Sequence, residues 1–308
     1  MNFSNEVKNE IISERIKNPC CRRAAISAFL RTAGSIETQG GKVGFSAQGD
    51  ENVLEYFRSM IKSLYGGEPK IISEKPKERK KLVFIGDASL DALVDCEIVS
   101  IENDGIAVSL NVSEYITEND CCKKAFVKGA FLGSGSVTIP TIGSDKKTGY
   151  HLEFAFSKYK TAADFAFLLS ELSLTPKTVE RKDEFVVYFK SSDEIGDVLN
   201  IMGATNSYLS LLDLVVKKDV VNNTNRAINC EMSNMNKQVE ASIKIREAIA
   251  AIDSVIGIDA LGEPLATVAR ARISNPEASL QDLAESLGLS KSCLSHRLNK
   301  IKKIAQDL

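Results

Sequence analysis

The chain has 308 residues, 44% of them hydrophobic, so it is long enough for two or three compact units that each bury a core. Its 39 lysines and arginines nearly balance 41 aspartates and glutamates, and the net charge of −2 creates no overall field that attracts nucleic acid. Any nucleic-acid site must therefore depend on a local concentration of positive charge. The N-terminal sequence lacks the apolar stretch of a secretion signal, and nowhere do about 18 apolar residues run together, so we expect a cytoplasmic protein that does not span a membrane.

An internal repeat organises the first two thirds of the chain. Residues 20–36 read CCRRAAISAFLRTAGSI and residues 121–137 read CCKKAFVKGAFLGSGSV, without a gap and at a constant offset of 101, which is 121 minus 20. The identical residues are Cys20 and Cys121, Cys21 and Cys122, Ala24 and Ala125, Gly34 and Gly135, and Ser35 and Ser136. Each copy has the small and apolar residues of a helix, ends at a glycine and continues into strand-like alternation.

The segments that follow the two copies also correspond. The predicted elements are strands at 42–47 and 80–85 around a helix at 51–64 in the first half, and strands at 151–156 and 185–189 around a helix at 162–172 in the second. Because the order of elements is the same in both halves, we expect two similar subdomains related by a pseudo-two-fold axis.

The repeated helices resemble the two LAGLIDADG helices of homing endonucleases. Residues 26–34, ISAFLRTAG, and residues 127–135, VKGAFLGSG, carry the small residues that let those helices pack closely. The resemblance implies an α+β fold with two pseudo-symmetric LAGLIDADG-like αββαββα subdomains, whose curved sheets lie along the major groove of DNA. We place the N-terminal segment and the first repeat in residues 1–115 and the second repeat in residues 116–216.

The nuclease chemistry of that family depends on one carboxylate at the end of each LAGLIDADG helix, where the pair holds divalent metal near the scissile phosphates. Ala33 and Ser134 stand at these positions, and neither supplies an anionic oxygen. Arg31 and Leu132 likewise replace the preceding aspartate of the motif. The resemblance therefore implies degenerate positions without catalytic residues, and we expect a protein that is not an enzyme and binds no metal or cofactor.

Three other segments of this part could carry chemistry, and each also has a simpler interpretation. Glu37 and Asp145 could supply substitute carboxylates, although neither stands at a matching position. Residues 133–136, GSGS, lack the spacing and the Lys-Ser/Thr pair of a Walker A phosphate loop. A basic run forms either a solvated hairpin or a phosphate-contacting surface. The residues of this run are Lys75, Lys77, Arg79, Lys80 and Lys81.

The cysteines show no metal-binding pattern in the sequence. The chain has seven cysteines, an odd number, without a C-x-x-C motif, and its two histidines, His151 and His296, stand far apart. The usual ligand spacing of a structural zinc site is therefore absent. We expect reduced thiols that pack as small apolar groups.

The composition changes after residue 216. Residues 217–236, KKDVVNNTNRAINCEMSNMN, are polar and indicate a linker. Residues 237–252 have helical periodicity, and Pro264 suits the first turn of another helix. The apolar positions of that periodicity are Val239, Ile243, Ile249 and Ile252. We therefore expect an all-α DNA-binding domain at residues 237–308.

Residues 280–301, LQDLAESLGLSKSCLSHRLNKI, are typical of a helix-turn-helix. The small side chain of Ala284 and the turn residue Gly288 let two helices cross closely. Ser290 suits the N-cap of the second helix. A helical hairpin that binds protein would produce a similar pattern, so this alternative stays open.

The second helix of this motif separates an apolar face from a polar, basic face. Leu294, Leu298 and Ile301 recur at helical spacing and should pack against the rest of the domain. From Lys291 to the end, the chain has five lysines or arginines against a single aspartate, so positive charge gathers on the helix that enters the groove. The residues expected to contact DNA are Lys291, Ser292, Ser295, His296, Arg297, Asn299, Lys300 and Lys303.

The chain as a whole resembles the WhiA family. The likeness lies in the degenerate LAGLIDADG helices, FSNEVKNEI at 3–11, NRAINC at 225–230 with Asn234 and Lys237, and SKSCLSHRL at 290–298. It implies a bacterial regulator that binds double-stranded DNA and acts in transcription, sporulation, cell division and chromosome segregation. It also implies a cytoplasmic, nucleoid-associated protein, with other transcription or division proteins as further partners and no membrane contact.

Two other functions remain open at the level of sequence, an active LAGLIDADG-type endonuclease and a protein-binding adaptor. No residue chemistry distinguishes a promoter activator from a nucleoid-associated division factor, or shows whether the repeats contact DNA or protein.

Overall fold

The computed structural model describes residues 2–74, 79–102, 105–141 and 148–308. The chain divides into two compact units, Met1–Lys218 and Asp219–Leu308. Three residues considered above, Lys75, Lys77 and Asp145, lie outside the described ranges.

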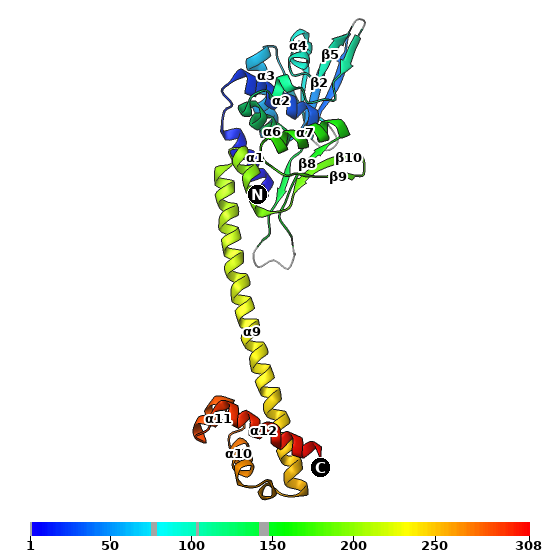
Figure 1. Ribbon diagram of the computed structural model, residues 1–308. Helices are drawn as coiled ribbons and strands as arrows, with labels where there is room; N and C mark the ends of the chain where they lie inside the picture. Colours follow the sequence, from blue (N-terminus) through cyan, green and yellow to red (C-terminus); the bar gives the residue numbers. More distant parts are fainter. Residues whose placement is uncertain (1, 75–78, 103–104, 142–147) are drawn as a thin grey trace. The chain divides into compact units, whose positions relative to one another are not determined.

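The first unit contains two repeats with the same order of elements (Figure 1). The first repeat consists of α2 (Pro19–Ala33), β1 (Gly34–Gln39), β2 (Lys42–Gln48), α3 (Glu51–Tyr65), β3 (Lys70–Glu74), β4 (Arg79–Ile85) and α4 (Asp87–Asp95). The second consists of α6 (Asp120–Ser134), β7 (Ser136–Thr138), β8 (His151–Phe156), α7 (Tyr159–Glu171), β9 (Lys177–Arg181), β10 (Glu184–Phe189) and α8 (Ser192–Ile201). Both follow the predicted αββαββα order, so the fold class is confirmed. The remaining elements of this part are α1 (Phe3–Ser13), β5 (Val99–Glu102), β6 (Gly105–Val108) and α5 (Glu114–Thr117).

Each repeat forms an antiparallel four-stranded sheet, and the strand orders correspond, β1-β2-β4-β3 and β7-β8-β10-β9. Strands β4 and β8 alternate between buried and more exposed residues, as expected for a strand with one buried face. In the first sheet, Phe45 lies opposite Phe84, and both side chains are buried. In the second sheet, Leu152, Phe154 and Phe156 of β8 are buried. Helices α3 and α4 pack on the first sheet and α7 packs on the second, so the core lies between sheets and helices.

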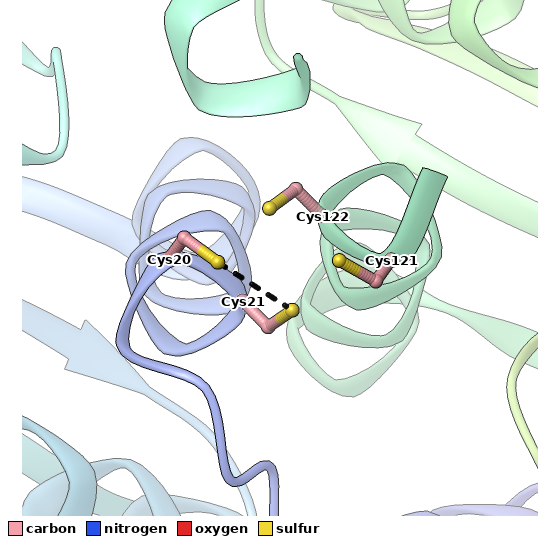
Figure 2. A group of neighbouring side chains, drawn as sticks. All are labelled: Cys20, Cys21, Cys121 and Cys122. Carbon is pink, nitrogen blue, oxygen red and sulfur yellow. Dashed lines mark hydrogen bonds between the residues drawn. The ribbon is translucent and has the colours of Figure 1, made fainter. Parts of the chain in front are cut away.

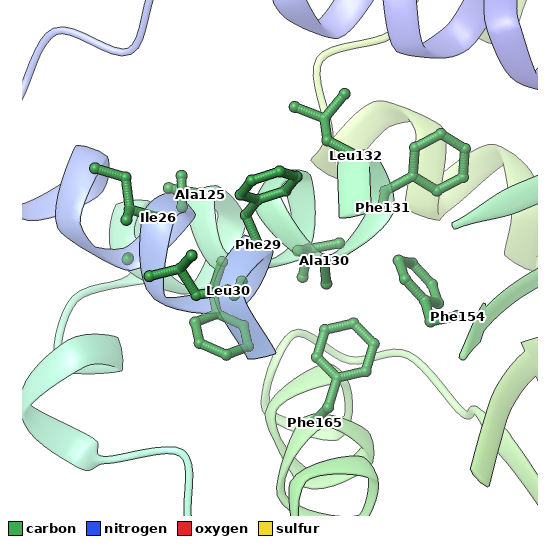
Figure 3. Packing of buried hydrophobic residues seen from close by; sticks show 14 of the residues in the cluster. Ile26, Phe29, Leu30, Ala125, Ala130, Phe131, Leu132, Phe154 and Phe165 are labelled. Carbon is green, nitrogen blue, oxygen red and sulfur yellow. The ribbon is translucent and has the colours of Figure 1, made fainter. Parts of the chain in front are cut away.

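Helices α2 and α6 pack against each other in the core of the first unit (Figure 3). A Cβ atom on Gly129 would overlap the backbone carbonyl oxygen of Ala25. One on Gly133 would overlap the side chain of Thr32. The two backbones therefore approach so closely that glycine is required on the α6 side of the contact.

Aromatic rings attach this helix pair to the rest of both repeats. Phe29 of α2 stacks on Phe57 of α3 with ring centroids 3.8 Å apart. Phe131 of α6 meets Phe154 of β8 edge to face at 5.9 Å, and Phe154 in turn meets Phe165 of α7 at 4.8 Å. Each such pair contributes about 0.5–1.5 kcal/mol beyond the burial of its area.

The close approach of α2 and α6 predicts that Gly129→Ala destabilises the first unit. Alanine favours a helix by about 1 kcal/mol over glycine, but the added methyl must displace the Ala25 carbonyl, and overpacking of this kind costs about 1–3 kcal/mol. We expect a lower melting temperature by scanning calorimetry. Gly149→Ala is the control, because Gly149 is exposed and its Cβ would meet no atom within 4 Å. Unfolding of Gly129→Ala at or above the wild-type temperature would contradict the packing described.

Helix α9 (Thr205–Val255) has 51 residues and includes the polar segment 217–236. Its composition indicates a linker, whereas the structure continues as a helix through this segment. The reason is that the helix contains no glycine or proline, and its asparagines and serines weaken a helix without ending it. The boundary between the two units falls inside α9, and residues 219–240 are exposed. No helix in the described parts of the chain combines the length and the apolarity that crossing a bilayer requires.

The second unit is all-α, as predicted. Besides the end of α9, it contains η1 (Ile258–Leu261), α10 (Glu263–Ser274), α11 (Leu280–Ser286) and α12 (Lys291–Gln306). Pro264 lies in the first turn of α10, which confirms its predicted role. The buried core consists of Ile245, Ile249, Ile252, Leu265, Val268, Ala269, Leu283, Ala284, Leu294, Leu298 and Ile301.

The face of α9 that enters this core differs in part from the predicted one. Ile249 and Ile252 are buried as expected, but Val239 and Ile243 are 53% and 46% exposed. Ile245 takes their place. At 3.6 residues per turn, Ile245 lies on the same side of the helix as Ile249 and Ile252, while Ile243 lies on the far side.

Candidate nucleic-acid interface

The turn between α11 and α12 has the predicted local interactions. The Ser279 hydroxyl accepts the Asp282 N–H at 3.1 Å, and the Asp282 carboxylate accepts the Ser279 N–H at 3.3 Å, so α11 begins with a capping box. Gly288 has a φ of 62°, in the left-handed region that favours glycine. The Ser290 hydroxyl accepts the Cys293 N–H at 3.2 Å and is the predicted N-cap of α12. The motif is a helix-turn-helix in its local geometry.

One face of α12 is buried and fixes how the helix is presented. Leu294, Leu298 and Ile301 are at most 1% exposed and pack in the core of the second unit. Ala284 of α11 is equally buried, so its small side chain occupies the contact that the sequence predicts. The opposite face of α12 is therefore held toward solvent.

Six of the eight predicted contact residues are exposed. Ser292, His296, Asn299 and Lys303 follow one another at spacings of four, three and four, so they lie on one stripe of the helix. The other two predicted residues, Ser295 and Arg297, are half-buried. The exposed members of the predicted set are Lys291, Ser292, His296, Asn299, Lys300 and Lys303. We call these six residues the α12 surface.

The lysines of the α12 surface are free of ion pairs within the described part of the chain. Among the residues that the structure describes, no carboxylate forms an ion pair with Lys291, Lys300 or Lys303. The acidic side chains of α11 are engaged locally, since Asp282 caps its helix and Glu285 accepts from Gln281. The α12 surface therefore offers free cations beside hydrogen-bonding groups, although the whole chain is slightly acidic.

The side chain of Arg297 is half-buried and contacts the rest of the second unit, so it differs from the exposed residues of the α12 surface. Its guanidinium lies 3.5 Å from the backbone carbonyl oxygen of Pro264, at the start of α10. In the structure, Arg297 therefore forms a hydrogen bond to the backbone of α10. Arg297 thus helps to join α12 to α10.

A buried arginine that is not among the predicted site residues holds the segment that leads into α11. Arg272 is only 2% exposed, and its guanidinium donates to the carbonyl oxygens of Ala278 at 2.7 Å and Asn275 at 3.4 Å. Burial lowers the pKa of Arg272 from its ordinary value. The spacing of Val268, Ala269 and Arg272 on one apolar helix face is the signal that could have identified it.

We predict that Arg272→Ala loosens the helix-turn-helix. The change removes packing and leaves two carbonyl groups without their donor, which costs about 1–3 kcal/mol. Amide hydrogen exchange in residues 280–306 of the full chain should therefore accelerate by about tenfold or more, since about 1.4 kcal/mol corresponds to tenfold. Arg270→Ala serves as the control, because Arg270 is half-exposed and paired only at the surface with Asp259 and Glu263. Equal exchange rates in the two variants would exclude the positioning role of Arg272.

The ends of α2 and α6, where the nuclease carboxylates would stand, carry other chemistry. Ala33 and Ser134 are the last residues of the two helices. The Ser134 hydroxyl accepts the Ala155 N–H of β8 at 3.2 Å. Arg31 donates to the carbonyl oxygens of Ser109 at 2.9 Å and Glu97 at 2.6 Å. Burial lowers the pKa of Arg31 to about 10, so it stays cationic at neutral pH.

The nearby carboxylate of Glu37 is engaged by other groups. It accepts from the Ser46 hydroxyl at 2.7 Å and pairs with Lys81 at 3.0 Å. Both interactions stabilise the anion, and they lower the pKa of Glu37, the hydrogen bond from Ser46 most. Within the described part of the basic run, Lys80 also pairs with a carboxylate, that of Glu51 at 3.6 Å. Lys81 and Lys80 are thus engaged in local ion pairs, the first within the first sheet and the second with helix α3.

These two units define a class of protein, in which paired LAGLIDADG-like repeats and a helix-turn-helix domain share one chain. Family models match its parts separately. The model described as the WhiA N-terminal LAGLIDADG-like domain matches residues 19–86, the WhiA LAGLIDADG-like domain matches 123–222, and the WhiA C-terminal HTH domain matches 224–305. The chain belongs to the WhiA family.

Relatives match over the whole length. The "Probable cell division protein WhiA" of Bacillus licheniformis is 35% identical over 314 residues, covering 100% of this chain and 97% of its own. That of Caldicellulosiruptor saccharolyticus is 35% identical over 317 residues, covering 100% and 96%. The crystal structure of full-length DUF199/WhiA from Thermatoga maritima aligns with a TM-score of 0.61 at 22% identity, covering 100% of this chain and 99% of that one, so it shares the fold.

Proposed function

We propose that the chain is a sequence-selective double-stranded-DNA-binding protein that acts as a transcriptional regulator, as a factor in cell division and chromosome segregation, or as both. The observation that carries the proposal is the α12 surface, whose lysines pair with no carboxylate that the structure describes and whose helix is fixed by a buried opposite face. The matching description of a C-terminal HTH domain and the cell-division name of the relatives support it. The site of action is the nucleoid.

The chemistry of the α12 surface divides between positioning and readout. Lys291, Lys300 and Lys303 are long cations suited to phosphate oxygens, which fix the register of a helix in the major groove. Asn299 can donate to and accept from one adenine edge, and His296 lies beside it on the same stripe. Ser292 and the half-buried Ser295 provide shorter hydroxyl contacts. Binding by such a surface combines a sequence-independent electrostatic part with a selective part.

The proposal includes the absence of nuclease activity. A metal ion at the ends of α2 and α6 would need anionic oxygens there, and Ala33 and Ser134 supply none. Arg31 adds a positive charge near this end of α2, which opposes a second cation. The repeats then act as a rigid platform, and the protein needs neither metal nor cofactor at the former catalytic positions.

Substitution of Asn299 and of Lys303 should reduce DNA binding in different ways. Asn299→Ala is expected to cost about 1–3 kcal/mol on the preferred site and little on scrambled DNA, because it removes a base contact. Lys303→Ala should weaken both duplexes alike and reduce the salt slope by about one, because it removes a phosphate contact. Both side chains are exposed, so folding is unaffected.

The measurement for this pair is fluorescence anisotropy on the two duplexes across a salt series. Lys182→Ala is a matched control, because Lys182 is an exposed lysine of the β9–β10 turn, outside the α12 surface. A uniform loss in Asn299→Ala would show that this residue reads no base. Unchanged binding in both variants would place DNA on another surface.

Incubation of the purified chain with plasmid DNA and magnesium or manganese should produce no nicks. The reason is the missing pair of carboxylates at Ala33 and Ser134. The assay is agarose electrophoresis of supercoiled DNA over several hours, with an active endonuclease as the positive control. Metal-dependent nicking that Glu37→Gln abolishes would overturn the expectation.

A further inference from the structure

Four cysteines lie together at the starts of α2 and α6. Cys20 and Cys21 follow Pro19 in the first turn of α2, and Cys121 and Cys122 follow Asp120 in the first turn of α6. Their four Sγ atoms all lie within 4.8 Å of one another. Figure 2 shows the four side chains turned toward the space between the two helices. Two of the thiols are buried, Cys21 and Cys122, and Cys20 is half-buried.

The duplication explains why these residues meet. Each pair occupies the same two positions in its own copy of the repeat, and α2 packs against α6. The pseudo-two-fold relation therefore brings two short-range pairs into one cluster. The spacing of cysteines within a single segment gives no indication of a metal site here. It cannot reveal a cluster that two separate segments form together.

The size of the cluster matches a single tetrahedral metal ion. Thiolate sulfurs bind zinc at about 2.3 Å, which places any two of four tetrahedral sulfurs about 3.8 Å apart. The sulfurs of Cys20 and Cys21 are already 4.0 Å apart. Small side-chain rotations would complete the set. An iron–sulfur cluster spreads its four cysteines around more than one iron and needs a wider ring of ligands.

We propose that Cys20, Cys21, Cys121 and Cys122 bind one zinc ion, which joins the first and second repeats through the starts of α2 and α6. Binding replaces four S–H bonds with four S–Zn bonds, and the protons pass to solvent. The loaded site carries four thiolate charges and one divalent cation, a net of about two negative charges. The site is distinct from the ends of α2 and α6 at Ala33 and Ser134.

The surroundings stabilise thiolates bound to a metal. All four sulfurs lie in the first turns of two helices, where unpaired N–H groups and the helix dipole favour negative charge. Basic residues follow each pair directly in the sequence, Arg22 and Arg23 in α2 and Lys123 and Lys124 in α6, and two of them are engaged elsewhere, Arg23 with Asp95 and Lys123 with Glu171.

Metal bound at this position would also help to hold the two sheets in a fixed orientation relative to each other. α2 continues directly into β1 at Gly34, and α6 leads through Gly135 into β7. A cross-link at the opposite ends of these helices restricts how they can shift or rotate along each other. The close contact at Gly129 and the zinc site would then hold the helix pair at two separate points.

The test uses the full chain, purified anaerobically with a reductant, stripped with a chelator and then supplied with zinc alone. We expect about one zinc and no iron per chain by plasma mass spectrometry after desalting. Alkylation followed by peptide mapping should show Cys20, Cys21, Cys121 and Cys122 protected by zinc, with exposed Cys230 modified equally with and without it. Because this mapping uses the unaltered chain, it does not depend on the folding of a variant.

The variant arm compares Cys21→Ser/Cys122→Ser with Cys230→Ser. We expect the double variant to lose at least tenfold in zinc affinity, measured by competition with a chromophoric chelator, and the control to bind as wild type. Absence of bound zinc from the wild type would overturn the proposal. So would zinc that does not protect the four cysteines, or a disulfide between residues 20–21 and 121–122 in the anaerobic protein.

Discussion

The contact between α2 and α6 is the constraint on which the first unit depends. Two copies of one sequence element meet there, and Gly129 and Gly133 bring the two backbones to a distance that a larger side chain would prevent. Each helix leads into the first strand of its own sheet, so the helix contact sets the relation of both sheets. Ala33 and Ser134 lie at one end of this pair and the four cysteines at the other.

In the second unit, a small number of residues fixes the orientation of α12. A buried stripe on α12, a positive-φ glycine in the turn and two serine caps determine which face of the helix reaches solvent. The lysines of that face have no carboxylate partner in the described part of the chain, and they create a local positive field although the chain has a net charge of −2, because exposed charges act over about a Debye length, roughly 10 Å. Overall charge is thus a poor guide to nucleic-acid binding in a chain of two units.

Much of the fold follows from the sequence because its signals are local and repeated. The duplicated helix, the alternation of β8 and the Gly288–Ser290 turn each depend on neighbours within a few residues, and the structure confirms them. Besides the role of Arg272, three features escaped prediction, because each depends on contacts across the fold or on a weak helix preference. The buried face of α9 is chosen by the helices that cover it, which moves the contact from Ile243 to Ile245. The helical state of 217–236 depends on the absence of helix breakers rather than on a positive signal. The cysteine cluster requires knowledge that the two repeats pack helix against helix.

A genome-wide map of bound DNA in the native host tests whether the α12 surface directs this chain to particular DNA sites. The comparison is between the unaltered chain and Lys300→Glu/Lys303→Glu, which reverses two exposed charges without touching the buried stripe. We expect discrete peaks that share a sequence in the unaltered chain and loss of those peaks in the variant at equal protein level. Uniform signal along the chromosome in the unaltered chain, or the same peaks in the variant, would show that the α12 surface does not select DNA sites.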